Sequence, residues 1–356
     1  MVVTSVLCVL LRVITCVYSS AYKSLMFPGA PPASPMLLLL QLLHAATAVP
    51  ALEPTIGILT YPVHNASALA ESCRSRHDAV CAAARSAHWA GGASYINSAY
   101  ARWLEMAGAR VVPIRYDLDP SAVRALFSQV NGVLFTGGPA KPLDAPAPYF
   151  ETASLLYSLC AAAKDVPLWG TCLGLQTIAC IANGARDVLG DMPVDNYAYP
   201  LNFTAAAKQS KLFGGLSSRG RADFEENVTT NWHHFGVSPR DLAATPLVPL
   251  ATNVALNGRE FVSALEGRGD LPVFAVQFHP ESVQWDAASG GVPAKTAAAI
   301  RSVQYLATTF VERARRNSHR FSSQALEAAA LVQQQGKLTQ TDASSLYPDN
   351  GVYVFS

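Results

Sequence analysis

The sequence predicts an α/β fold: a doubly wound, mixed but largely parallel sheet with additional antiparallel strands. Two observations predict it. In the first part of the chain, short apolar runs alternate with helix-like segments, which is the order of parallel strands joined by crossover helices. Beyond about residue 185, short apolar runs follow one another closely, which favours mixed or antiparallel strands. No internal repeat or coiled-coil heptad is visible.

Four apolar runs of strand length predict the parallel part of the sheet. They are Thr55–Leu59, Arg110–Ile114, Gly132–Thr136 and Val166–Gly170. Helices are predicted beside them at Ser94–Gly108, Pro120–Gln129, Tyr149–Lys164 and Leu173–Ala182. In a sheet of this kind, functional residues gather at the carboxyl ends of the strands. Gly137-Gly138 and Cys172 both fall at such ends.

The second half of the chain predicts further strands and one long helix. The apolar runs Leu247–Ala251, Phe261–Leu265 and Val273–Phe278 are expected to cover one edge of the sheet. A helix is expected at Ala294–Arg315, and the polar tail from Asn317 onward has no clear pattern. We therefore divide the chain into a targeting region (1–50), a folded domain (51–316) and a C-terminal extension (317–356).

The composition fits a globular domain that does not bind nucleic acid. The length of 356 residues allows two domains, but one large α/β domain fits as well, and half of the residues are hydrophobic. The net charge is only +1, and no basic run with interleaved aromatic residues is present, so nucleic acid is not an expected partner.

The N-terminal 50 residues resemble a targeting region rather than a folded domain. An apolar run at Val2–Tyr18 is followed by a Pro-rich break and a second apolar run, Met36–Leu43, that leads to Ala46-Thr47-Ala48. The second run fits a signal peptide with a small-residue cleavage site. The first run could be a second targeting element, a signal anchor or a gene-model artefact. Both runs are shorter than the roughly 20 residues of a bilayer span. We expect cleavage near Ala48 and a mature protein with no stable membrane span.

Three N-glycosylation sequons agree with secretion. They begin at Asn65, Asn202 and Asn227. The alternative is chance, because the pattern is short.

Five cysteines would remain after removal of the leader, and an odd number predicts a free thiol. Cys73 and Cys81 lie in one polar insertion and could form a local disulfide. Cys160 and Cys180 lie in predicted helices and are expected to be buried. No cysteine or histidine pair has the spacing of a zinc site, so we expect no metal.

The segment around Cys172 has the pattern G-x-C-x-G between a strand and a helix, which is the cysteine form of a nucleophile elbow. Gly170 and Gly174 are expected because no Cβ fits so close to the turn. The start of the helix after Cys172 favours the thiolate over the thiol. The alternative is a buried structural cysteine, which is what most free cysteines are.

A second segment could supply a base for this thiol. The apolar run at Val276 ends in Phe278-His279-Pro280-Glu281, so that His279 could take the thiol proton and Glu281 could hold its far ring nitrogen. Alone, this segment could be a surface turn. Gly138 and Leu173 could donate backbone N–H groups to an oxyanion, although a Gly-Gly pair is more often an ordinary tight turn.

Three motifs together resemble the class I glutamine amidotransferase-like hydrolases: F-T-G-G-P, W-G-T-C-L-G-L-Q and V-Q-F-H-P-E. That resemblance implies a three-layer, doubly wound sheet. Four further segments are similar to the γ-glutamyl hydrolases, and the similarity covers roughly residues 54 to 316. These segments are Thr55–Leu59, Ala107–Pro113, Pro200–Thr204 and Asn231–Phe235.

The resemblance implies a thiol hydrolase that cleaves γ-linked glutamates from folates, through a thioester, in lysosomes, vacuoles or secretions. It makes Cys172 the nucleophile, His279 the general acid and base, and Glu281 the third member of the triad. His233 matches a histidine that assists at the substrate, and the adjacent His234 leaves a shift of one position open. No metal or organic cofactor is implied. Lys211 or Arg110 could meet the carboxylates of a polyglutamate tail.

Two other functions remain as alternatives. One is a glutamine amidotransferase-type glutaminase, or another γ-glutamyl amide hydrolase; a fused synthetase is not expected, because only about forty residues follow the last predicted helix. The other is a catalytically inactive, secreted binding protein on the same fold. The sequence leaves open the choice between endo and exo cleavage, and whether the protein forms a homodimer.

Overall fold

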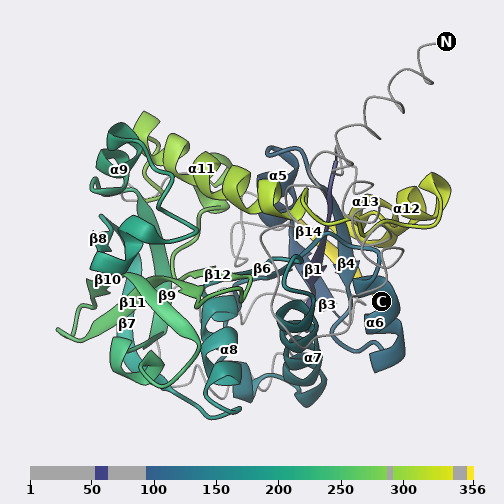
Figure 1. The fold of residues 1–356 in the computed structure, drawn as a ribbon, viewed down its shortest axis with the longest axis horizontal. Helices are drawn as coiled ribbons and strands as arrows, with labels where there is room; N and C mark the ends of the chain where they lie inside the picture. The colour runs from purple at the N-terminus through teal and green to yellow at the C-terminus, as the bar shows by residue number, and fades with distance from the viewer. Residues whose placement is uncertain (1–52, 63–93, 287–291, 340–350) are drawn as a thin grey trace, which may run out of the picture. The chain divides into compact units, whose positions relative to one another are not determined.

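An eight-stranded sheet forms the centre of the computed structural model, which describes residues 53–62, 94–286, 292–339 and 351–356 (Figure 1). All of these residues belong to one compact unit, Pro50–Ser356. The strand order is β4-β1-β5-β6-β12-β11-β10-β8. The first five strands run parallel, and the last three continue the sheet in antiparallel pairing. The predicted mixed, largely parallel sheet is therefore confirmed.

The parallel strands are β1 Thr55–Leu59, β4 Arg110–Ile114, β5 Gly132–Phe135, β6 Leu168–Thr171 and β12 Val273–Val276. The antiparallel strands are β8 Asn202–Phe203, β10 Leu247–Val254 and β11 Glu260–Gly267. In the register between β6 and β12, Thr171 lies opposite Val276. The two strands therefore end level with each other, and the residues that follow them emerge side by side.

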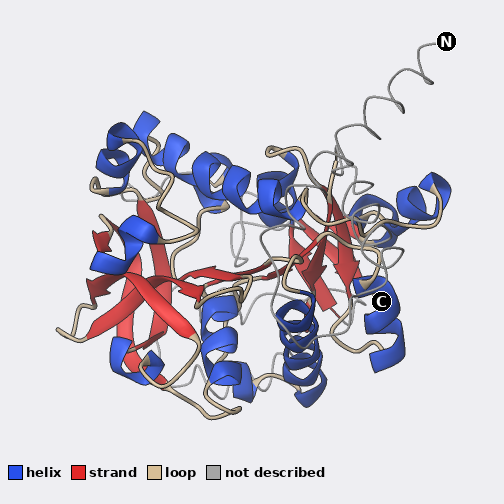
Figure 2. Cartoon of the chain, in the orientation of Figure 1, coloured by secondary structure: helices blue, strands red, loops and turns tan. Residues whose placement is uncertain are grey.

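Helices cover both faces of this sheet, which gives the three expected layers (Figure 2). One face packs against α5 Ser98–Glu105 and α11 Ala297–Ala314. The other packs against α6 Pro120–Phe127, α7 Ala147–Ala163 and α8 Leu173–Ala182. Each face has its own hydrophobic cluster because successive strand residues point to opposite sides: Trp169 belongs to the first cluster and Leu168 to the second.

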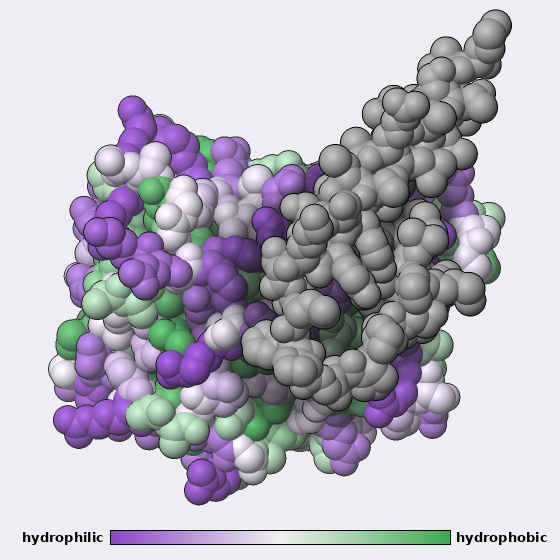
Figure 3. Space-filling view, in the orientation of Figure 1, coloured by the Kyte–Doolittle hydropathy of each residue, from purple (hydrophilic) through white to green (hydrophobic). Residues whose placement is uncertain are grey.

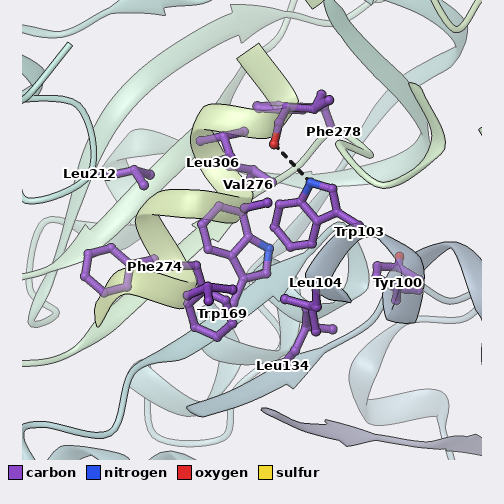
Figure 4. Packing of buried hydrophobic residues seen from close by; sticks show 14 of the residues in the cluster. Tyr100, Trp103, Leu104, Leu134, Trp169, Leu212, Phe274, Val276, Phe278 and Leu306 are labelled. Atoms are coloured by element: carbon purple, nitrogen blue, oxygen red, sulfur yellow. Dashed lines mark hydrogen bonds between the residues drawn. The ribbon is translucent and has the colours of Figure 1, made fainter. Parts of the chain in front are cut away.

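Two tryptophans fix α5 against the sheet (Figure 4). The rings of Trp103 and Trp169 lie 5.3 Å apart between their centroids, and Trp169 also contacts Phe310 of α11 at 5.6 Å. Trp103 Nε1 donates a hydrogen bond of 3.0 Å to the Val303 carbonyl oxygen of α11. Trp169 Nε1 donates to Thr171 Oγ1 at 2.9 Å, which fixes the last residue of β6 as well. These contacts hold the last residues of β6 in place.

A two-stranded ribbon, β7 Leu189–Tyr199 and β9 Thr229–Val237, is a feature that the sequence pattern does not predict. β7 is polar and largely exposed or half-buried, and β9 is mostly buried but rich in polar residues, so neither has the apolar alternation of a strand with one face in a core. A small cluster of buried residues holds the ribbon to β11. This cluster is formed by Met192, Val194, Ala255 and Phe261.

A third sheet has the order β13-β14-β3-β2 and corrects the expected helix at Ser94–Gly108. Ser94–Asn97 is strand β3, and the helix begins at Ser98 because the extended Asn97 caps it by accepting a hydrogen bond of 2.8 Å from the Ala99 amide. The C-terminal segment supplies β14 Val352–Phe355, which pairs with β3. The other two strands are β2 Tyr61–Pro62 and β13 Lys337–Thr339.

The remaining elements are short. They are η1 Pro142–Asp144, η2 Ala205–Gln209, η3 Pro239–Leu242, α9 Ser218–Phe224, α10 Ser282–Trp285, α12 Gln324–Ala330 and α13 Val332–Gln335. On the face in Figure 3, hydrophilic side chains surround scattered hydrophobic ones where residues are described. No helix among the described residues is long and apolar enough to cross a membrane. The expected leader, Asn65, Cys73 and Cys81 lie outside these residues.

Candidate active site

Cys172 occupies the turn between β6 and α8 in a conformation that is rare for a residue with a side chain. Its backbone angles are φ 52° and ψ −106°, and its amide donates a hydrogen bond of 2.8 Å to the Val276 carbonyl oxygen. A Cβ on Gly174 would lie 2.3 Å from the Phe135 carbonyl oxygen, and one on Gly170 would lie 2.7 Å from the Gly174 carbonyl carbon. The expected need for glycine at both positions is therefore confirmed.

His279 follows β12 and reaches the same end of the sheet. Its amide donates a hydrogen bond of 2.8 Å to the Thr230 carbonyl oxygen of β9, which fixes the turn after β12. Its Nδ1 lies 2.7 Å from Oε1 of Glu281. Both side chains are buried: His279 is 8% exposed and Glu281 3%. A carboxylate in this position fixes the ring orientation and leaves Nε2 for other partners.

The thiol of Cys172 and the imidazole of His279 lie against the same glycine. A Cβ on Gly137 would lie 2.7 Å from His279 Cε1 and 3.5 Å from Cys172 Cβ. Burial lowers the pKa of His279, but the Glu281 carboxylate and Cys172 raise it more strongly, so its pKa lies well above the usual value. This electrostatic setting favours the imidazolium form of His279.

The turn after β5, Gly137-Gly138, is closely surrounded by side chains of other elements. The Gly137 amide donates a hydrogen bond of 2.7 Å to the Tyr100 hydroxyl of α5. A Cβ on Gly138 would lie 2.6 Å from Leu173 Cδ2 and 2.9 Å from the Tyr61 ring. No described residue accepts a hydrogen bond from the Gly138 or Leu173 amide. Two neighbouring N–H groups are therefore free for a ligand oxygen beside Cys172.

Two buried glutamines contact this centre. Gln277 Nε2 donates to Cys172 Sγ at 3.6 Å, and Gln176 Nε2 donates to the Phe235 carbonyl oxygen at 2.7 Å. Gln176 lies in the motif W-G-T-C-L-G-L-Q, and Gln277 lies in V-Q-F-H-P-E. The two motif sequences do not by themselves show that these side chains meet near the thiol.

The ribbon strand β9 brings three aromatic side chains near the site, and only one of them contacts His279. The ring of Trp232 lies 5.5 Å from that of His279, and the Trp232 carbonyl oxygen is 4.0 Å from Cys172 Sγ. His233 points to the opposite face of the strand, where its ring meets the edge of Phe261 at 4.8 Å. His234 pairs with Asp191 at 2.9 Å.

The imidazole of His233 is buried without a hydrogen-bond partner among the described residues at either ring nitrogen. Burial lowers its pKa to about 3, and the nearby charge of His279 acts in the same direction. Backbone groups of Phe235 and Met192 oppose this shift only in part. His233 is therefore neutral at physiological pH, and both of its ring nitrogens are enclosed by the protein.

The two basic residues considered for a polyglutamate tail lie at the other end of the sheet. Lys211 donates to the carbonyl oxygens of Gly267, Gly269 and Leu271, each at 2.8 Å. Arg110 begins β4 and pairs with Glu53 and Glu327. Because parallel strands place their first residues far from the carboxyl ends, neither side chain can meet a tail that enters near Cys172.

The other described cysteines differ from Cys172 in their surroundings. Cys160 and Cys180 are buried in α7 and α8, as expected. Burial raises the pKa of the Cys160 thiol strongly and that of Cys180 to about 11. In the part of the chain that the structure describes, no group of three or more His, Cys, Asp or Glu side chains is arranged to hold a metal ion.

Comparison with known proteins gives a match to one broad family and matches to individual proteins. The family described as "Glutamine amidotransferase class-I" matches residues 92–289. Human γ-glutamyl hydrolase is 34% identical over 254 residues, which cover 68% of this chain and 78% of the relative. γ-Glutamyl hydrolase B of Dictyostelium discoideum is 33% identical over 254 residues, which cover 68% of this chain and 72% of the relative.

The comparison with solved structures finds matches of lower similarity. A glutamine amido transferase from Methylobacillus flagellatus has a TM-score of 0.45 and 15% sequence identity, and the match covers 77% of this chain and all of that chain.

Proposed function

The chain belongs to the γ-glutamyl hydrolase family of class I glutamine amidotransferase-like proteins, and from this premise we propose that it hydrolyses the γ-glutamyl bonds of folylpoly-γ-glutamates through Cys172, His279 and Glu281. The observation that carries the proposal is the meeting of the Cys172 turn with the His279–Glu281 pair at the level ends of β6 and β12. A thiol, a base and an orienting carboxylate are the three groups that acyl transfer through a thioester requires.

In the first half of the proposed reaction, the Cys172 thiolate attacks the γ-carbonyl carbon of the substrate. The carbonyl oxygen becomes an oxyanion and accepts hydrogen bonds from the Gly138 and Leu173 amides. The imidazolium of His279 gives its proton to the leaving α-amino nitrogen, and the C–N bond breaks. The products of this half are a free amine, which is the released glutamate or γ-glutamyl peptide, and a thioester that joins Cys172 to the γ-carbonyl group of the remaining folate.

In the second half, neutral His279 takes a proton from water, which attacks the thioester carbonyl carbon. The C–S bond breaks, the electron pair returns to sulfur, and a γ-carboxylate leaves. Glu281 orients the ring throughout the cycle and stabilises each imidazolium. This cycle needs no metal or organic cofactor. We assign His233 to substrate placement because Asn231–Phe235 is similar to the corresponding segment of the γ-glutamyl hydrolases.

We also propose that the chain enters the secretory pathway and acts outside the cell or in a lysosome or vacuole. The leader-like N-terminus supports this, and so does the exposure of two sequon asparagines, Asn202 and Asn227. A homodimer is compatible with the proposal but is not required by it, because every residue in the proposed cycle comes from one chain.

The substrate is tested by product analysis. Purified protein is incubated in parallel with a folate pentaglutamate and with free glutamine, and the products are separated by chromatography. The proposal predicts shorter folates with released glutamate or γ-glutamyl peptides, and little ammonia from glutamine. Rapid conversion of glutamine to glutamate with an intact folate would instead identify a glutaminase.

A further inference from the structure

The Gln277 side chain ends next to the sulfur of Cys172. Gln277 is the first residue after β12, and it has no exposed surface. Its amide donates a hydrogen bond of 2.9 Å to the Ser263 carbonyl oxygen of β11, so that its backbone continues the sheet. Its Nε2 is 3.6 Å from Cys172 Sγ, a normal length for an N–H group that donates to sulfur.

A second glutamine fixes which end of the Gln277 amide faces the sulfur. Gln176 Nε2 lies 2.7 Å from the Phe235 carbonyl oxygen, which can only accept a hydrogen bond. The same Nε2 lies 3.4 Å from Gln277 Oε1. Because Gln176 must present its nitrogen to Phe235, it also presents a donor to Gln277, whose oxygen must then be on that side. Nε2 of Gln277 is therefore directed at the sulfur.

The other groups around the sulfur do not replace this donor. The Trp232 carbonyl oxygen, at 4.0 Å, can accept a proton from a thiol but would repel a thiolate. The titratable groups near Cys172 are His279 from the turn after β12, with Glu281 behind it, and Tyr100 from α5, which also contacts Gly137. His233 of β9 points to the opposite face of its strand, against Phe261. Of these, only the imidazolium of His279 favours the thiolate.

We propose that Gln277 is a thiolate-stabilising donor: its side-chain amide holds the sulfur of Cys172 as a thiolate, and Gln176 is the positioning residue that keeps this amide turned toward the sulfur. The proposal deepens the proposed function and rests on Cys172 as the nucleophile. The hydrogen bond favours the charged sulfur before attack. It is weakened when the C–S bond of the thioester forms, and it returns when that bond breaks and the electron pair goes back to sulfur.

The test is the alkylation rate of Cys172 by iodoacetamide over a range of pH, followed by mass spectrometry of the Cys172 peptide. This readout needs no substrate, and mapping to the peptide separates Cys172 from the other thiols. Gln277→Met keeps a side chain of similar length without a donor. We expect its alkylation near neutral pH to be about tenfold slower, and the rise of the rate to move to higher pH, since one hydrogen bond to a charged group is lost.

Two further variants make the result specific. Gln176→Met leaves the Gln277 amide free to turn, so we expect a smaller shift in the same direction. Thr177→Val is the control, because Thr177 is buried in the same helix and its described hydrogen bonds, with the Leu173 carbonyl oxygen and with Tyr149, involve neither Cys172 nor Gln277. Its pH profile should match the wild type. If Gln277→Met fails to give a cooperative thermal transition, the profile of Gln176→Met decides.

The outcomes separate the role of Gln277 from the proposed function. A wild-type pH profile in folded Gln277→Met overturns the role of Gln277, whatever the activity of that variant. The proposed function fails separately, if Cys172→Ala still hydrolyses the folate polyglutamate. A shifted profile together with an inactive Cys172→Ala supports both.

Discussion

Nδ1 of His279 lies 2.7 Å from Oε1 of Glu281, two residues further along the chain, and both side chains are buried at the ends of β6 and β12. A buried carboxylate this close raises the pKa of the imidazole against the opposing effect of burial. The pair therefore favours a protonated imidazole next to Cys172, which is the state that a general acid for an amine leaving group needs.

The first prediction separates the roles of these two residues. His279→Ala should reduce the single-turnover rate by about 10³-fold or more, because proton transfer in both half-reactions is lost. Glu281→Gln should cost less, about 10²-fold, because the amide oxygen can still accept from Nδ1 while the charge is lost. Equal rates for the two variants would give Glu281 a larger role than orientation, and a fully active His279→Ala would move the base to another residue.

The second prediction concerns Gly137, which lies between the thiol and the imidazole. In Gly137→Ala, the new methyl group would need the place of His279 Cε1, 2.7 Å away, and of the Tyr100 hydroxyl, 2.9 Å away. We expect kcat to fall at least tenfold, with a small change in melting temperature. The matched control is Gly215→Ala, where the nearest atom is 3.7 Å away and activity should not change. Equal activities of the two variants would contradict the described geometry.

The third prediction is a pH dependence of stability caused by His233. Its folded-state pKa, about 3, lies below the unfolded value near 6.5, so the unfolded state binds a proton that the folded state does not. Stability from this group is fully present above about pH 6.5 and falls by about 1.4 kcal/mol per pH unit as the pH drops toward 3. His233→Leu should remove this loss.

Chemical unfolding at about pH 7 and about pH 5 checks this prediction. The drop in unfolding free energy between the two values should be about 2 kcal/mol larger for the wild type than for His233→Leu. The raised pKa of His279 has the opposite sign, since its stabilisation is present at low pH and lost at high pH, but it is common to both proteins and cancels. Equal drops would mean that His233 is protonated in the folded protein.

The fourth prediction concerns glycans on the described surface. Asn202 in β8 and Asn227 before β9 are exposed. In a eukaryotic host, the protein should run faster on a gel after glycosidase treatment, and Asn202→Gln and Asn227→Gln should each reduce that difference where the site is used. An unchanged band for the wild type, with Met1 intact in the mature protein, would contradict entry into the secretory pathway.

The parallel part of the fold could be predicted because its signals are local. β1, β4 and α8 have the bounds that the apolar runs indicate, since each buried strand is a short apolar run with a helix beside it. The Cys172 turn is equally local, because Gly170 and Gly174 mark the close approach of two backbones. His279 could be placed near it because a base at one strand end faces a nucleophile at the next.

What the sequence did not predict depends on distant contacts. The β7–β9 ribbon is polar, so its register and the position of Trp232 beside His279 follow from packing on β11 rather than from periodicity. The pairing of β14 with β3 joins segments far apart in the chain, and neither has a distinctive pattern. The orientation of the Gln277 side-chain amide toward the sulfur is set by its contact with Gln176. The spacing of these residues in the sequence does not predict that contact.

The most direct test of the central claim is the initial rate of folate pentaglutamate hydrolysis by Cys172→Ala, measured beside the wild type with melting curves for both. We predict a variant that melts like the wild type and has lost at least about 10³-fold in rate, because no other described group can form the thioester. A folded Cys172→Ala that keeps a tenth or more of the wild-type rate would contradict the claim that Cys172 is the nucleophile of a γ-glutamyl hydrolase.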